Sequence, residues 1–300
     1  MSKGYIKIIF PLLVSFLYMS NKVLADEGDE GIEDLRKFAR PPTNPNDDNE
    51  CSEESSEQNS SEFYVYKEQT KAAEELMDEA EDLLYSYATN TNDYTLYNKL
   101  SEDSIEYYKK CGETTIYKFN HKIERPDKYN YIVEKIWNPQ LRKFDGHTIK
   151  EKVEHQYSPD LVMIQHRYTN DTMMFNGYYY ALAKKYQISD KETLITYASP
   201  DVYDPNKVDE WRFKNTLLES ANSFKQKICS EKDILNGELI KMFVNLSGYI
   251  IRKEEDHVDI TFVHSIDVHH PPDVKDSLID IVHSAQILNL IKLSIEACNE

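Results

Sequence analysis

Hydrophobic positions follow the clearest patterns in the last sixty residues of the chain. Alternating apolar and polar residues predict two strands, Glu238–Arg252 and His257–Val268, which lead into a helix over Asp273–Cys298. A surface helix normally carries one apolar face about 100° wide. This helix is apolar around most of its circumference, so it must be covered on more than one side. A sheet would cover one side, and more of the protein, a partner or an apolar ligand would cover another. Its main stripe consists of Val274, Leu278, Ile281, Val282, Ala285, Leu288, Ile291 and Ile295.

The preceding residues predict one long helix, one short helix and many strands. Apolar residues recur every three or four positions over Lys67–Ala88, and a short helix spans Pro126–Trp137. Polar turns separate the strands, which indicates an antiparallel sheet, and Ser199–Val208 reads as a longer polar loop. The fold class is therefore α+β, with a curved antiparallel sheet around the C-terminal helix. The strand candidates are Tyr94–Leu100, Ser104–Lys110, Thr114–Ile123, Thr148–Tyr157, Leu161–Tyr168, Gly177–Ile188, Glu192–Ala198 and Thr216–Ile228.

Alternation also assigns the faces of the last two strands. We expect one face of the sheet to pack on the core and the other to be mostly solvated. In the final strand the buried positions are Val258, Ile260, Phe262, His264, Ile266 and Val268. In the strand before it they are Ile240, Met242, Val244, Leu246 and Ile250.

The N-terminal part divides into two segments. Residues 1–25 resemble a secretory signal peptide, with Lys3 and Lys7 before an apolar run and small residues at Val23–Ala25. Residues 26–62 hold 13 Asp and Glu against 3 Lys and Arg, with few large apolar residues. Such a segment is predicted to be disordered. The domain then covers residues 63–300. Polar residues interrupt its C-terminal helix, so we expect no transmembrane span there.

Charge and cysteine content limit the partners. The net charge of −18 argues against nucleic acid and against constitutive docking on anionic membranes. Local basic patches at Lys184-Lys185 and Arg142-Lys143 remain open. A secreted protein can form disulfides, and three complete pairings are open. The four cysteines are Cys51, Cys111, Cys229 and Cys298.

Sequence motifs for catalysis or cofactors are absent. There is no G-x-S-x-G elbow, no H-E-x-x-H pair and no glycine-rich phosphate loop, so we predict neither an enzyme nor a cofactor. His264, Asp267, His269 and His270 lie close in sequence. Alternation along a strand sends them to opposite faces, so no metal site is predicted.

Several segments resemble the fam-a multigene family of rodent malaria parasites. The resemblance runs from about residue 63 to 270 and departs at Val268, where that family usually has Gly. It implies a START-like helix-grip fold that encloses a lipid, with phosphatidylcholine as cargo. The matching segments are Leu161–Tyr168, Tyr179–Lys185, Leu218–Phe224, Asn236–Leu239, Phe243–Ile251 and Val258–Asp267.

Such a cargo requires apolar walls and a few polar contacts. Arg167 is the candidate for the phosphate, since guanidinium binds phosphate in a bidentate manner, although a surface ion pair is the alternative. Tyr180 and Tyr249 are candidates for choline through cation–π attraction, although most Tyr residues are simply sheet and core. The expected walls are Leu182, Leu278, Ile281, Val282 and Ala285.

The sequence thus predicts a secreted, non-catalytic carrier of one phospholipid. It would contact membranes transiently and act as a monomer. The alternative is a surface or host-interacting protein of the same fold without lipid transfer. Lys22-x-Leu24-x-Asp26 resembles a parasite export motif, so the parasitophorous vacuole or host erythrocyte is a further expected location.

Overall fold

The computed structural model describes residues 61–138, 141–144, 146–171, 175–203, 213–268 and 272–299. The predicted signal peptide and residues 26–60 of the acidic segment lie outside this range. The first described element, the helix α3, begins at Ser61.

Most of the expected helices and strands are confirmed. The helices are α3 (Ser61–Thr89), α4 (Tyr129–Trp137), α5 (Lys232–Leu235) and α6 (Pro272–Asn299), with 3-10 turns η1 (Pro126–Lys128) and η2 (Glu219–Asn222). The first six strands are β1 (Thr95–Ser101), β2 (Ser104–Cys111), β3 (Thr114–Ile123), β4 (Leu141–Phe144), β5 (His147–Ser158) and β6 (Leu161–Asn170). The other six are β7 (Phe175–Ser189), β8 (Glu192–Ala198), β9 (Asp201–Tyr203), β10 (Lys225–Lys227), β11 (Ile240–Lys253) and β12 (Val258–Val268).

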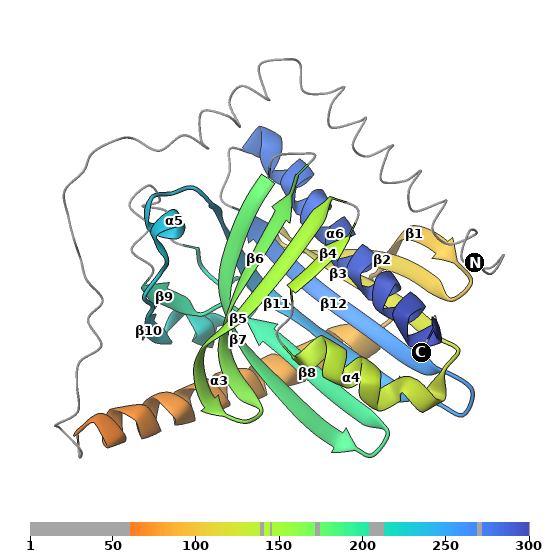
Figure 1. The fold of residues 1–300 in the computed structure, drawn as a ribbon, viewed down its shortest axis with the longest axis horizontal. Coiled ribbons are helices and arrows are strands. Elements are labelled where there is room, and N and C mark those ends of the chain that lie inside the picture. Colours follow the sequence, from red (N-terminus) through yellow and green to blue (C-terminus); the bar gives the residue numbers. More distant parts are fainter. Residues whose placement is uncertain are drawn as a thin grey trace.

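Ten strands form one curved sheet in the order β1-β2-β3-β12-β11-β8-β7-β6-β5-β4. Sequential strands pair through short turns, which gives the expected antiparallel ladders. The β3–β12 pair joins the N-terminal strands to the C-terminal hairpin. Helix α6 lies along one face of the sheet (Figure 1), which we call the inner face.

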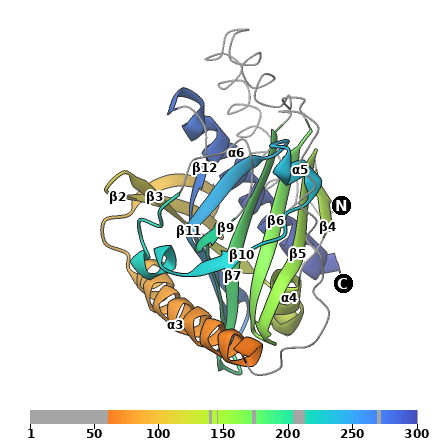
Figure 2. The same cartoon turned by 90° about the vertical axis from the view of Figure 1, so that its left-hand side faces the viewer.

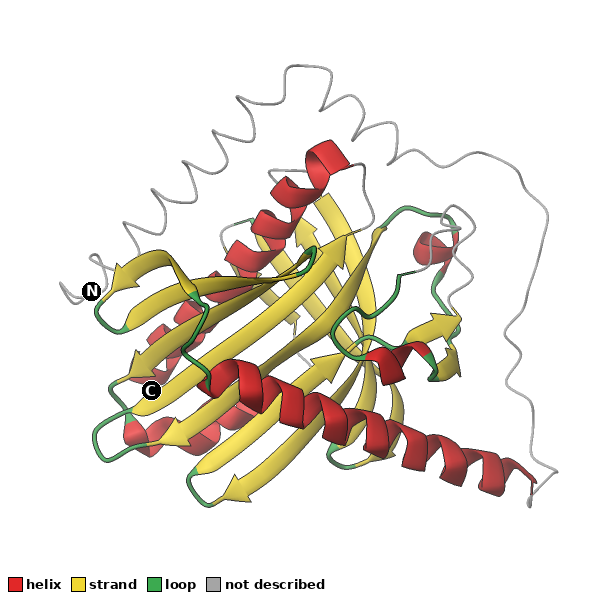
Figure 3. Ribbon diagram, turned by 180° about the vertical axis from the view of Figure 1, so that it is seen from behind, coloured by secondary structure: helices red, strands yellow, loops and turns green. Residues whose placement is uncertain are grey.

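Both faces of the sheet are covered, contrary to the expectation of one solvated face. Figures 2 and 3 show α3 crossing the face opposite α6, which we call the outer face. The apolar stripe of α3 packs there with Leu161, Met163 and Leu182 of β6 and β7. The intervening residues of the same strands, such as Val162 and Ala183, pack with α6 on the inner face. The sheet is therefore the middle layer of three.

A bulge in β11 corrects the predicted face of that strand. Met242 and Val244 pack toward α6, whereas Leu246 packs with α3. The register against β12 shifts between Val244 and Leu246, so Asn245 is an extra residue. One inserted residue exchanges the faces of everything that follows it. Tyr249 consequently lies on the inner face.

Gly248 allows α3 to approach the outer face of β11 closely. A Cβ atom at this position would lie 2.5 Å from Cδ2 of Leu84 and would also overlap the carbonyl oxygen of Ile195. Real Cβ atoms do not approach other heavy atoms so closely. The contact between α3 and the sheet therefore requires glycine here.

The predicted strand over Thr216–Ile228 is wrong. The segment contains an irregular stretch, η2 and only one short strand, β10. This strand pairs in parallel with β9, which lies within the segment Ser199–Val208 that was predicted to be a loop. Asparagine side chains replace the expected ladder: Oδ1 of Asn215 accepts from the backbone N–H groups of Leu217 and Leu218. Oδ1 of Asn245 accepts a hydrogen bond from the backbone N–H group of Thr216. Side-chain acceptors of this kind stabilise turns in place of a sheet. The strand β4 was not predicted.

Helix α6 is one candidate membrane span among the described residues. Leu278–Asn299 is long and apolar enough by length and composition, despite the polar residues that argued against a span. Half of that segment is buried within the protein. The core helix of a soluble domain has the same properties.

The cysteines fall into two states. Cys111 and Cys298 carry free thiols. Cys229 is disulfide-bonded. Cys51 lies outside the described residues.

Candidate functional site

A polar cavity lies between the inner face and α6. We call it the inner cavity, and its volume is about 50 Å³. Strands β4 to β8 and β11 supply one side, while α4 and α6 supply the other. Its apolar walls are Ile136, Ile149, Leu290 and Leu293. Its polar groups are Arg142, Glu151, His166, Tyr179, Tyr197, Ser247, Tyr249, Gln286 and Asn289.

The guanidinium of Arg142 connects the edge strand β4 to both neighbouring helices. Its Nη1 atom donates to Oδ1 of Asn289 on α6 at 2.8 Å. Its Nη2 atom donates to the backbone carbonyl of Lys135 on α4. These contacts hold a positive charge against the inner cavity, where a planar guanidinium can bind a carboxylate or phosphate.

Glu151 and His166 form the opposing polar pair. They are register partners on β5 and β6, and Nδ1 of His166 lies 2.9 Å from Oε1 of Glu151. Because the carboxylate only accepts, the proton of a neutral imidazole belongs on Nδ1. The ring of His166 stacks on Tyr179 with centroids 4.6 Å apart. The inner cavity therefore contains one cationic and one anionic side chain.

Three tyrosine hydroxyls complete the inner cavity. Burial, followed by the nearby charge of Glu151, raises the pKa of Tyr179, Tyr197 and Tyr249 well above its usual range. All three therefore stay protonated near neutral pH and can donate. None of the three hydroxyls hydrogen-bonds to a described residue. Donors that line a cavity in this way are normally satisfied by water or a ligand.

The structure divides the predicted site residues between the two faces of the sheet. Among them only Tyr249 lines the inner cavity. Leu278, Ile281, Val282 and Ala285 are buried residues of α6 that pack with the inner face and line neither cavity, so their role as lipid walls stays a prediction. The side chain of Val274 lies outside those that are described.

Arg167 lies on the outer face, which corrects its predicted place in the cavity. Its guanidinium pairs with Asp233 and with Glu231, and Nε donates to Gln165 at 2.7 Å. The hydrogen bond from Arg167 lowers the pKa of Asp233. Arg167 shares its face with Met163 and Gln165, as alternation predicted, but that face packs against α3 and α5. The surface ion pair was the correct alternative.

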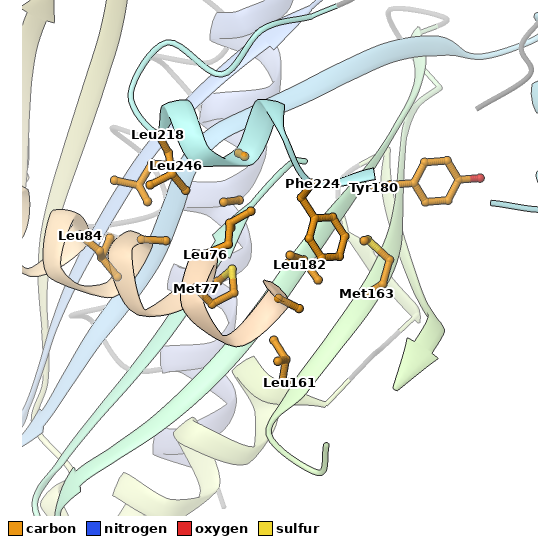
Figure 4. Close-up of a cluster of buried hydrophobic side chains, with 14 of the residues drawn as sticks. Leu76, Met77, Leu84, Leu161, Met163, Tyr180, Leu182, Leu218, Phe224 and Leu246 are labelled. Carbon is orange, nitrogen blue, oxygen red and sulfur yellow. The ribbon is translucent and has the colours of Figure 1, made fainter. Parts of the chain in front are cut away.

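Tyr180 and Leu182 also lie on the outer face. Leu182 packs with Met163 and the α3 residues Leu76 and Met77 (Figure 4). The ring of Tyr180 points away from this cluster, and its hydroxyl lies 2.9 Å from Oγ of Ser230 and 3.0 Å from Nε2 of Gln165. Neither residue faces α6.

Apart from Tyr249, the polar residues of the inner cavity were not among the predicted site residues, for an identifiable reason. His166 points to the opposite face of β6 from the predicted site residue Arg167, and Glu151 is its register partner on β5. A charged residue such as Glu151 in a strand normally indicates a position that faces solvent. One signal was available: Gln286 and Asn289 are polar and three residues apart on the otherwise apolar C-terminal helix. Side chains at this spacing share a helix face.

The basic patch at Lys184-Lys185 is neutralised by neighbouring carboxylates. Nζ of Lys184 lies 2.6 Å from Oδ1 of Asp78, and Nζ of Lys185 lies 2.8 Å from Oδ1 of Asp160. Arg142 belongs to the inner cavity. These lysines therefore offer no concentrated positive surface.

A hydroxyl–imidazole pair occurs beneath α6. Nδ1 of His121 lies 2.8 Å from Oγ of Ser104, and Nε2 lies 2.6 Å from Oγ of Ser294. These residues do not line the inner cavity, so the contacts attach α6 to β2 and β3. His269 and His270 lie outside the described residues. Within the described ranges, no three His, Cys, Asp or Glu side chains are grouped to hold a metal ion.

Comparisons with known proteins bear on the fold. No family model matches the sequence, and no curated protein matches it either. Human StAR-related lipid transfer protein 5 is similar in structure, with a TM-score of 0.56 and 12% identity, over 76% of this chain and 98% of that one. Human STARD10 gives a TM-score of 0.46 and 9% identity, over 72% of this chain and 76% of that one.

The fold is START-like. This conclusion rests on the similarity to human StAR-related lipid transfer protein 5 and on the curved antiparallel sheet that holds α6. At such low identity the similarity concerns the fold alone. The more specific resemblance to the fam-a family stays a prediction.

Proposed function

We propose that the protein binds and transfers a lipid, held between the inner face of the sheet and α6. The observation that carries this proposal is the inner cavity itself, where the three tyrosine hydroxyls have no described partner. The START-like fold supports it, since the similar human protein is named a lipid transfer protein. Apolar side chains of the sheet and α6 around the cavity would accept the hydrocarbon part.

The balanced charges of the cavity favour a zwitterionic headgroup, and we propose phosphatidylcholine. Arg142 would bind the phosphate, and the rings of Tyr197 and Tyr249 would attract the choline. Glu151 would repel a second negative charge, which disfavours net anionic lipids. Arg142 thus takes the role that the sequence assigned to Arg167.

Loading would require α6 to move. The inner cavity of about 50 Å³ has the volume of one or two waters, at roughly 30 Å³ each, whereas ligand pockets span roughly 300–1,000 Å³. The lipid would therefore separate α6 from the sheet as it enters. Opening of such a covering element commonly limits the rate of the whole process.

The same small volume favours a second candidate function. If α6 never leaves the sheet, the protein keeps the START-like fold without a cargo. It would then act through its surface, as a displayed or host-interacting protein.

Lipid extraction from the purified protein distinguishes the two functions. We expect mass spectrometry to find bound phosphatidylcholine and the protein to move labelled phosphatidylcholine between vesicles. Protein that carries no lipid and transfers none would support the surface function. Transfer of anionic lipids in preference to phosphatidylcholine would contradict the headgroup assignment.

Secretion and export are further proposals that rest on the sequence alone. We propose that residues 1–25 direct the protein out of the cell that makes it. Tagged protein, followed by microscopy with and without these residues, would locate it in the vacuole, the host cell or neither.

A further inference from the structure

A second cavity opens beside the inner cavity, and we call it the outer groove. Its volume is about 170 Å³. The end of α4 and the strands β5 to β8 line it, and α6 contributes no lining residue. Its apolar lining residues are Trp137, Val153, Pro159, Val162, Ile164 and Ala183. The outer groove thus lies on the inner face, where Val162 and Ala183 also belong to the cluster that packs with α6.

Glu151 and Tyr197 line both cavities. The polar inner cavity and the more apolar outer groove are therefore neighbours that share two side chains as a partition. Tyr197 is only partly buried, and its ring contacts Tyr249 edge to face with centroids 6.4 Å apart. Val153, which also lines the groove, is 39% exposed, although valine is among the residues that are most often buried.

We propose that the outer groove holds the apolar chain of the lipid whose polar end lies in the inner cavity. This inference rests on the proposed function and adds a route for the chain between Glu151 and Tyr197. Two observations favour a hydrocarbon chain as the occupant: the groove shares Glu151 and Tyr197 with the polar cavity, and half of its ten lining residues are aliphatic. An apolar cavity of about 150 Å³ is enough to bind benzene, so the outer groove has room for a segment of the hydrocarbon chain rather than for all of it.

Trp137 provides a direct reporter of occupancy. The chain contains two tryptophans, so Trp211→Phe leaves Trp137 as the only one. The probes are phosphatidylcholines brominated either near the ester end or near the methyl end of one chain. We expect the methyl-end bromines to quench Trp137 fluorescence more strongly, because the ester end stays in the inner cavity.

A matched pair of variants tests the route. Val153 and Ile188 are both exposed apolar residues on strands, at 39% and 51% exposure, but only Val153 lines the groove. Val153→Glu places a charge in the groove, so we expect at least a tenfold loss of phosphatidylcholine affinity. Ile188→Glu should bind normally. Thermal unfolding of both variants establishes that each is folded.

The outcomes separate this inference from the function on which it rests. Protein that binds phosphatidylcholine, yet shows no difference between the two brominated probes and none between the two variants, overturns the groove and leaves the carrier intact. Protein that binds no lipid at all overturns both.

Discussion

The imidazoles of His264 and His283 hydrogen-bond to each other inside the protein, Nε2 of the first to Nδ1 of the second. The pair joins β12 to α6, and the two rings stack with centroids 4.7 Å apart. Tyr117 stacks on His283 at 4.2 Å, and Oε2 of Glu106 lies 3.9 Å from Nε2 of His283. A hydrogen bond between two imidazoles needs one ring nitrogen as acceptor, so the two rings cannot be cationic at the same time.

Acid should therefore weaken the attachment of α6. Burial, and then the charge on His283, lowers the pKa of His264 well below 6.5, and burial lowers that of His121 to about 4. The unfolded chain takes up these protons near pH 6.5, before the folded chain does. Stability is thus full above pH 6.5 and falls toward pH 4, by up to about 1.4 kcal/mol per histidine and pH unit.

Urea unfolding at a series of pH values measures this dependence. His121→Gln should flatten the slope between pH 6.5 and 4, because one of the protons is no longer taken up on unfolding. His257→Gln is the control, since His257 lies in the turn between β11 and β12. Equal slopes in both variants would contradict the assignment of His121.

Two arginines on opposite faces should differ in lipid binding. Arg142→Gln removes the guanidinium from the inner cavity, and we expect about tenfold weaker phosphatidylcholine binding or more, as for a lost hydrogen bond to a charged group. Arg167→Gln breaks the ion pairs with Asp233 and Glu231 on the outer face. It should leave binding unchanged and lower stability by less than about 1 kcal/mol. Vesicle transfer assays on both variants would reverse our assignment if Arg167→Gln were the defective one.

Gly248→Ala should destabilise the protein by about 1–3 kcal/mol, as overpacking does. The added methyl group would overlap Leu84 and the carbonyl of Ile195, so α3 would have to move away from the sheet. Chemical denaturation measures the loss. A variant as stable as the natural sequence would show that α3 does not pack tightly there.

Ser265→Ala should have the opposite effect. The Oγ atom of Ser265 is buried and has no hydrogen-bond partner in the described part of the chain. An unpartnered hydroxyl costs about 1–3 kcal/mol, so its removal should stabilise the protein by about 1 kcal/mol. The melting temperature should rise. A lower one would indicate that the hydroxyl makes a contact after all.

The sequence predicted most of the helices and strands, but not which face of each strand meets which helix. Polar turns on either side located β5, β6, β7 and β8, and β12 also has a clear period of two. Alternation alone does not say which face meets which helix. Because α3 and α6 cover opposite sides, the face that carries Arg167 packs against α3 and α5 instead of α6.

Local insertions and polar turns account for the other differences. The extra residue Asn245 reverses the faces of β11 without changing its hydrophobic content. Thr216–Ile228 has a strand-like composition, but the side chains of Asn215 and Asn245 bind its backbone instead of a neighbouring strand. The inner cavity depends on contacts among β4, β5, β6 and α6, which are distant in sequence and carry no common motif.

The strand β12 has β11 on one side and β3 on the other, with Val263 opposite both Gly248 and Lys118. During synthesis β3 therefore keeps an unpaired edge until more than a hundred later residues have been made and β12 can pair with it. Such distant pairings make folding slow, and an open edge can join another chain. Premature termination before residue 258 would leave two half-sheets, each with a strand edge available for aggregation.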